Sequence, residues 1–183
     1  MALPRQDVAR ATAISSLYIQ ALRAGETLWF QVVSGSMVPT LNVGDSVRIE
    51  PVNAKDIHNG DIAAFETDQG LVIHRIVQQE RKGASIRLLE MGDVDLRASW
   101  VEEQAVVGRV AIVRRSTRQI DLRRPIAKRC GTVTAYVRYR LYLLHTNKKF
   151  AALRVTVRKS SRVAVRIGNW YLQMSSVSPV IVE

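Results

Sequence analysis

The sequence has little cysteine, proline or glycine, and each shortage excludes a class of protein. Its one cysteine, Cys130, excludes an intramolecular disulfide framework and a cysteine-rich zinc module. Five prolines and ten glycines are too few for a collagenous or low-complexity chain. The three histidines, His58, His74 and His145, are scattered along the chain and show no metal-ligand spacing. We therefore expect neither a metal nor another cofactor.

Long hydrophobic runs are also missing. The longest stretch without a charged residue, residues 27–44, contains serine, glycine, proline and asparagine, which makes it a poor membrane span. The beginning of the chain lacks the basic-then-apolar pattern of a secretory signal peptide. The sequence therefore predicts a cytoplasmic protein with no transmembrane helix, for which any membrane association is peripheral.

Acidic residues are absent from almost the whole last third of the chain. Residues 122–182 contain 13 Lys and Arg and no Asp or Glu, whereas residues 1–121 are nearly balanced in charge. The net charge of +11 therefore belongs to the C-terminal part of the chain. Hydrophobic residues make up 47% and charged residues 23%, which is a composition that supports a packed core. The pattern predicts a balanced front followed by a basic extension.

The front of the chain has the pattern of a mainly β domain. Apolar residues at spacings of three and four predict one helix over residues 7–23, with Gly25 as its stop. Short β-rich segments follow, separated by turns such as Asn59-Gly60. The predicted strands are residues 28–33, 43–52, 61–66, 70–77, 85–91 and 105–114.

An ordered set of short motifs follows the first predicted strand. Residues 34–41 read Ser-Gly-Ser-Met-Val-Pro-Thr-Leu, and they are followed by two Gly-Asp pairs, by His74-Arg75 within a strand, by Met-Gly-Asp at 91–93 and by Gly-Arg at 108–109. Taken singly these motifs are common, because a serine beside glycine usually marks a turn and a lone histidine on a strand is usually structural. Their order and spacing are the informative feature.

This ordered set resembles the superfamily of type I signal peptidases and LexA-type serine peptidases, over about residues 28–113. The resemblance implies a catalytic β domain at residues 27–121, after an N-terminal helical segment at 1–26 and before the basic C-terminal extension at 122–183. Bacterial signal peptidases and LexA-type proteins use a lysine as the general base. His74 stands at the matching strand here, so the chain resembles the Ser-His branch of archaeal and endoplasmic-reticulum signal peptidases.

The chemistry of a serine and a histidine fits this resemblance. A serine hydroxyl is a weak nucleophile at neutral pH and needs a neighbouring base, whose help is typically worth ~10²–10⁴ in rate. An imidazole can accept that proton near neutral pH, whereas a lysine must first be desolvated. Ser36 is the predicted nucleophile and His74 the predicted base. Lys55 and Lys82, the lysines nearest to that strand, lie in polar, turn-like contexts and are the weaker candidates.

Further residues are expected to support the pair. The resemblance places the aspartate that orients His74 in or just after the Gly-Asp box, at Asp93 or at Asp95, and the alternative for Asp93 is a turn-forming cap. The backbone N–H of Ser36 is a candidate oxyanion donor. The hydroxyl of Ser34 is a second donor candidate, with a simple serine turn as its alternative.

The apolar residues of the serine motif are expected to form the floor of a substrate cleft, a role that is compatible with core packing. These residues are Met37, Pro39 and Leu41.

The basic extension contains no catalytic motif. Arg154, Arg158, Arg162 and Arg166 recur every four residues, which suits one helix face and equally suits two alternating strands. Either structure has one apolar and one cationic face. Such a face suits an anionic membrane surface or an acidic protein, and it also suits packing on the domain with its charges in solvent. Nucleic acid is a weaker candidate because no nucleic-acid module is present.

The sequence thus predicts a serine endopeptidase that cleaves a leader or precursor peptide through an acyl-enzyme. One alternative is a LexA-like self-cleaving regulator, for which Ala24-Gly25 is a small-residue pair of the kind such proteins cut. The other is a non-catalytic module that binds a membrane surface or nucleic acid through its basic extension.

Overall fold

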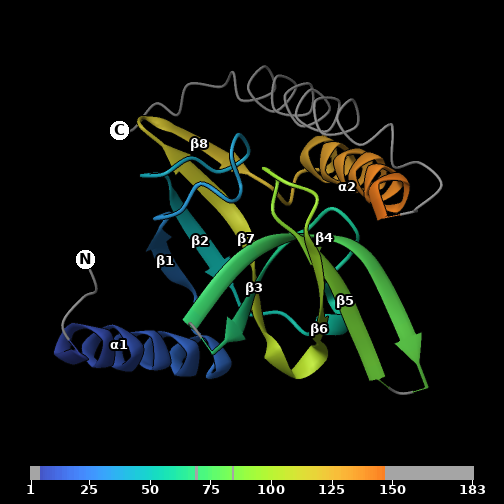
Figure 1. The fold of residues 1–183 in the computed structure, drawn as a ribbon. Helices are drawn as coiled ribbons and strands as arrows, with labels where there is room; N and C mark the ends of the chain where they lie inside the picture. The colour runs from blue at the N-terminus through green and yellow to red at the C-terminus, as the bar shows by residue number, and fades with distance from the viewer. Residues whose placement is uncertain (1–4, 69, 84, 147–183) are drawn as a thin grey trace.

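Two α-helices flank one curled β-sheet in the computed structural model, which describes residues 5–68, 70–83 and 85–146 (Figure 1). The helices are α1 (Arg5–Arg23) and α2 (Pro125–Thr146). The strands are β1 (Leu28–Gln31), β2 (Ser46–Glu50), β3 (Ile62–Thr67), β4 (Gly70–Lys82), β5 (Ser85–Met91), β6 (Ala98–Glu102), β7 (Val106–Arg115) and β8 (Arg118–Asp121). Single turns of 3₁₀-helix span Ala54–Asp56 and Glu103–Ala105. The prediction of a mainly β fold with an N-terminal helix is confirmed.

All eight strands of the described residues join one antiparallel sheet, in the order β1-β2-β7-β3-β4-β5-β6, with β8 paired to β7. The long strand β4 organises this sheet. Its first half pairs with β3 and its second half with β5, and the register shifts between Ile76 and Gln78. Such irregularities bend a strand, and β4 arches over the sheet in Figure 1. The bend brings residues from β4 and β5 to the inside of the curl.

The core is divided between the two helices. On β2, Val47 and Ile49 alternate with half-buried neighbours and pack with Leu22 of α1 in one apolar cluster. Ala135 of α2 packs in another cluster with residues of β4 and β5. The two helices therefore cover different parts of the sheet, and Figure 1 shows them on opposite sides of the arch of β4.

The helix α1 ends where the sequence predicts. Gly25 follows it with φ of +97°, a left-handed conformation that glycine adopts without strain. Neither α1 nor α2 is long and apolar enough to cross a membrane. The arginine series from Arg154 to Arg166 lies outside the described residues.

Candidate active site

Ser36 lies on the loop that connects β1 to β2. Two backbone hydrogen bonds close the base of this loop, from Val32 N to Asp45 O at 2.8 Å and from Gly44 N to Val32 O at 2.9 Å. Inside the loop, Leu41 N donates to Met37 O at 2.9 Å, and both of these apolar side chains are buried in the core. The loop is therefore fixed at its base and by its apolar residues, and Ser36 is left half-buried at its surface.

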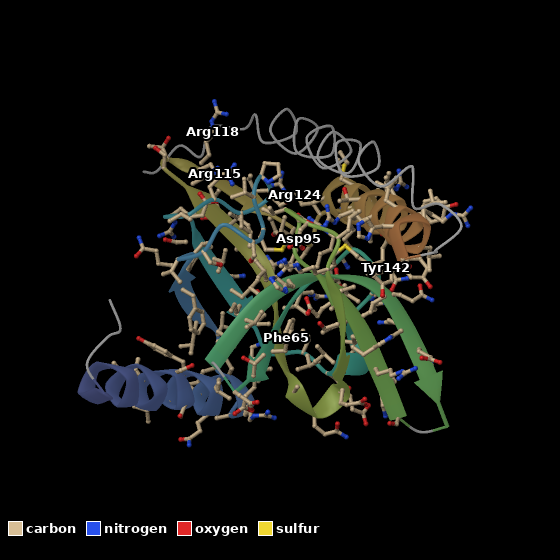
Figure 2. The ribbon with its side chains drawn as sticks, in the orientation of Figure 1. Phe65, Asp95, Arg115, Arg118, Arg124 and Tyr142 are labelled. Carbon is tan, nitrogen blue, oxygen red and sulfur yellow. The ribbon has the colours of Figure 1, made fainter. Side chains whose placement is uncertain are left out.

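His74 lies on β4 and faces this loop. Its Nε2 is 3.1 Å from the Oγ of Ser36, which is hydrogen-bond distance. The edge of the Phe65 ring contacts the imidazole, with ring centroids 6.1 Å apart, and Phe65 lies beneath the arch of β4 (Figure 2). The structure thus brings the predicted nucleophile and the predicted base together, although 38 residues separate them in sequence.

The carboxylate at the other side of His74 belongs to Glu90, a residue that sequence reasoning did not single out. Its Oε2 is 2.5 Å from the Nδ1 of His74. Glu90 lies on β5 opposite Ile76 of β4 and is largely buried. A hydrogen bond at Nδ1 fixes the tautomer in which Nε2 is free to accept a proton. The sequence signal for this role was an acidic residue between the apolar residues Leu89 and Met91 of a predicted strand.

Asp93, the predicted orienting aspartate, does not contact His74. Its carboxylate is buried and accepts hydrogen bonds from Arg75 at 3.0 and 2.8 Å and from Thr40 at 2.5 Å. Burial alone raises the pKa of Asp93, but the charge and hydrogen bonds of Arg75, together with the charge of Arg138 and the Thr40 hydroxyl, outweigh it and hold the pKa below its usual range. Asp93 therefore joins the nucleophile loop to β4.

The alternative aspartate, Asp95, lies on the side of the molecule that faces α2 (Figure 2). Its carboxylate accepts the backbone N–H of Arg97 at 3.1 Å. This contact is an Asx turn at the surface. The structure therefore brings neither predicted aspartate to the imidazole.

Two small residues lie next to the Ser36–His74 pair. The hydroxyl of Ser34, a predicted oxyanion donor, is 3.5 Å from that of Ser36. A Cβ at Gly92 would lie 2.9 Å from the carbonyl oxygen of Ser36 and 3.4 Å from the Nε2 of His74. Such a contact with backbone is too short, so only glycine fits at position 92.

A cavity of about 700 Å³ opens beside Ser36 and His74. Of the three residues predicted for the floor of a substrate cleft, Met37 and Leu41 line this cavity and Pro39 does not. One wall comes from α1, which contributes Ile14 and Tyr18. The other lining residues include Phe30 of β1 and Leu71 and Ile73 of β4. The cleft is therefore mainly apolar and ends at the hydroxyl of Ser36.

The remaining candidates lie away from this cleft. Lys55 belongs to an exposed 3₁₀ turn, and Lys82 is the last residue of β4. His58 is exposed beside Asp61, and His145 lies near the end of α2. Within the described ranges, no three His, Cys, Asp or Glu side chains gather as metal ligands.

The curled sheet, with a serine on the loop after its first strand, defines the class of LexA and signal-peptidase-like serine peptidases. The chain belongs to the Peptidase S24-like family, whose sequence model matches residues 5–110. The match contains Ser36, His74 and Glu90 and ends within β7, so that β8 and α2 lie outside it. No curated protein matches the chain.

Proposed function

We propose that this protein is a serine endopeptidase in which Ser36 is the nucleophile, His74 the general base and Glu90 a positioning residue. One observation carries the proposal: a single imidazole links the Glu90 carboxylate at 2.5 Å to the Ser36 hydroxyl at 3.1 Å. A carboxylate, imidazole and hydroxyl in series is an arrangement that activates serine on many unrelated folds. Membership of a peptidase family supports the same reaction.

The reaction follows from these contacts. The Oγ of Ser36 attacks the scissile carbonyl carbon while the Nε2 of His74 takes the hydroxyl proton. The tetrahedral intermediate collapses, His74 returns the proton to the leaving amine, and an acyl-enzyme remains on Ser36. Water then attacks the ester, again with His74 as base, and frees the acid and the Ser36 hydroxyl. The Glu90 carboxylate accepts a hydrogen bond from the Nδ1–H of His74 throughout and stabilises the imidazolium form.

The cleft supports a peptide substrate with an apolar side chain near the cut. Its lining includes Met37, Leu41, Phe30 and Tyr18, and its volume of about 700 Å³ exceeds that of one side chain. A leader or precursor segment in extended conformation could place its carbonyl at Ser36 and its apolar side chains in the cleft. This substrate class matches the signal-peptidase-like chemistry that we propose.

Release of a defined fragment from a peptide library with apolar residues tests the proposal. We expect wild type to cleave and Ser36→Ala to be inactive, with Ser85→Ala, an exposed serine at the start of β5, as the matched control. Cleavage by Ser36→Ala at the wild-type rate would exclude the mechanism.

Self-cleavage is the rival reaction within the family. The candidate bond Ala24–Gly25 lies in the turn that follows α1, where Ala24 N donates to Gln20 O at 2.8 Å and Gly25 N donates to Leu22 O at 3.1 Å. A bond in such a turn is less able to enter the cleft than a bond in an extended peptide. We therefore favour cleavage of another chain.

The outer face of α2 supports a second proposal, attachment to an anionic membrane surface. Val133 and Tyr136 are 63% and 62% exposed, and Ile126 and Leu143 extend the same face. The exposed Arg129 and Arg140 lie between these apolar residues at spacings of three and four. Apolar side chains can enter the lipid interface while arginines pair with lipid phosphates, each worth about 1 kcal/mol.

Co-sedimentation with vesicles tests the attachment. We expect wild type to bind vesicles that contain phosphatidylglycerol and not vesicles of phosphatidylcholine alone. Val133→Asp should weaken the binding. Val43→Asp, which changes an equally exposed valine on the loop between β1 and β2, should not. Equal binding by the two variants, or no binding by wild type, would overturn the assignment.

A further inference from the structure

A fully buried arginine connects α2 to the candidate active site. Arg138 lies on α2, and its side chain is 0% exposed. Its Nη2 donates to the carbonyl of Gly92 at 2.5 Å and also to that of Asp95, and its Nη1 donates to the carbonyl of Asp93 at 3.0 Å. One guanidinium therefore holds three carbonyls of the loop that follows β5.

Burying a guanidinium is costly unless hydrogen bonds and an opposite charge compensate it. Burial lowers the pKa of Arg138, and the negative charge of Asp93, whose Oδ1 lies 3.7 Å from the Nε, opposes that effect. The Asp93 carboxylate thus lies between two buried arginines, Arg75 from β4 and Arg138 from α2. A side chain that served only to attach α2 to the sheet could have been apolar.

The loop that Arg138 holds also contacts the nucleophile. Val94 N donates to the carbonyl of Ser36 at 3.0 Å. Gly92 lies against Ser36 and the His74 imidazole so closely that no side chain fits there. The same four residues, 92–95, therefore contact α2 through their carbonyls and the Ser36–His74 pair through an N–H and a glycine.

We infer that Arg138 is a positioning residue of the peptidase, which acts through loop 92–95 to hold Ser36 and His74 at reacting distance. The inference rests on the proposed function. It makes α2 part of the catalytic unit although α2 lies outside the family match. A displacement of about 1 Å at a reacting group can cost ~10² in rate, so a distant arginine can control the rate without touching substrate.

The geometry requires a guanidinium. Its planar fork donates several hydrogen bonds in fixed directions, whereas a lysine ammonium is a single point charge. Arg138→Lys keeps the positive charge that faces Asp93, but it leaves some of the three loop carbonyls without a hydrogen-bond donor. Arg138→Met keeps the apolar stem and removes both the charge and the donors.

The test measures how fast a fluorophosphonate acylates Ser36, per folded molecule and well below the unfolding transition. We expect Arg138→Met to be acylated ~10–10²-fold more slowly than wild type, following the sensitivity of rate to displacement, and Arg138→Lys to be intermediate. Lys128→Met, an exposed cation of α2, is the control and should react as wild type does. In peptide cleavage the loss should fall on kcat, with KM nearly unchanged.

Each outcome supports or overturns the inference. If wild type is acylated and folded Arg138→Met reacts at the same rate, Arg138 only stabilises the fold and the inference is wrong. If Arg138→Met does not fold, Arg138→Lys decides by the same comparison. If wild type itself is not acylated, the proposed function is wrong. That result differs from equal rates in wild type and Arg138→Met, which would overturn only the role of Arg138.

Discussion

At the scale of single residues, the acid that contacts His74 is Glu90 and not the aspartate that motif order suggests. Asp93 stands in the Gly-Asp box yet binds Arg75, whereas Glu90, three residues earlier, binds His74. The sequence could predict Ser36 and His74 as candidates because the order and spacing of their motifs are informative. It could not predict Glu90, because its approach to His74 depends on how β5 pairs with β4 across a register shift.

Replacement of Glu90 tests its role in orienting His74. Glu90→Gln keeps the shape of the side chain but can donate to Nδ1 and so favour the wrong tautomer. Amide replacement of such a carboxylate can cost ~10⁴ in kcat, so we expect peptide cleavage to slow by about 10²-fold or more. Glu80→Gln, an acid of β4 paired with Arg87, is the control. A Glu90→Gln enzyme with wild-type kcat would show that the contact has no catalytic role.

Asp93 should contribute to the stability of the fold and not to the orientation of the His74 imidazole. The pKa of Asp93 is lowered in the folded protein. Its contribution to the free energy of unfolding is therefore fully present above the unfolded pKa of about 3.9, and it is lost as the pH falls through the pKa of the folded state. Asp93→Asn leaves two buried arginines without their counter-charge and should cost about 3–5 kcal/mol near pH 7.

Urea unfolding across pH checks this expectation. The difference in unfolding free energy between wild type and Asp93→Asn should shrink as pH falls below about 3.9. Asp68→Asn, at an exposed turn, is the control and should resemble wild type throughout. A difference that stays constant down to pH 3 would contradict the account.

At the scale of elements, the sequence predicted six of the eight strands in the described residues and missed β6 and β8. The pattern at residues 85–91 matches β5, and that at 7–23 matches most of α1. The strand β8 contains a single apolar residue, Ile120, and so shows no strand pattern. The helix α2 contains tyrosine, valine and threonine, whose intrinsic preference is for strands, and it is helical because its inner face packs on the sheet.

The docking of α2 requires a close approach between two glycines. A Cβ at Gly131 would lie 2.8 Å from the carbonyl oxygen of Gly60, in the turn before β3. Gly131→Ala should therefore destabilise the protein by about 1–3 kcal/mol through overpacking, although alanine favours an isolated helix by about 1 kcal/mol.

The matched substitution is Val133→Ala, on the exposed face of the same helix. It removes a β-branched residue without any clash and should be neutral or slightly stabilising. Thermal unfolding of both variants gives the comparison. Stabilisation by Gly131→Ala would show that α2 does not pack as closely as the structure has it.

At the scale of the whole molecule, composition predicted a balanced front and a basic extension, but it could not predict how they meet. The predicted boundary at residue 121 coincides with the end of β8, and α2 begins at Pro125. Charge counts treat this extension as one cationic segment. The structure gives α2 two faces: one contacts loop 92–95 through Arg138, and the other exposes Val133 and Tyr136.

Cleavage of another chain and self-cleavage differ in their effect on the intact mass of the protein. Because Ala24–Gly25 belongs to the hydrogen-bonded turn that follows α1, we expect the intact mass of purified wild type to stay constant during incubation at raised pH. Ser36→Ala is the control for cleavage by a contaminating protease. A cut at Ala24–Gly25 in wild type but not in Ser36→Ala would establish the self-cleaving alternative.

The most direct test of the central claim is covalent labelling by a fluorophosphonate, followed by intact-mass and peptide-mass analysis. A serine activated by a neighbouring imidazole displaces fluoride and keeps the phosphonyl group. We predict a single adduct on the peptide that contains Ser36, no adduct in Ser36→Ala, and labelling at least ~10²-fold slower in His74→Ala. An unlabelled wild type, or equal labelling of the three proteins, would contradict the account.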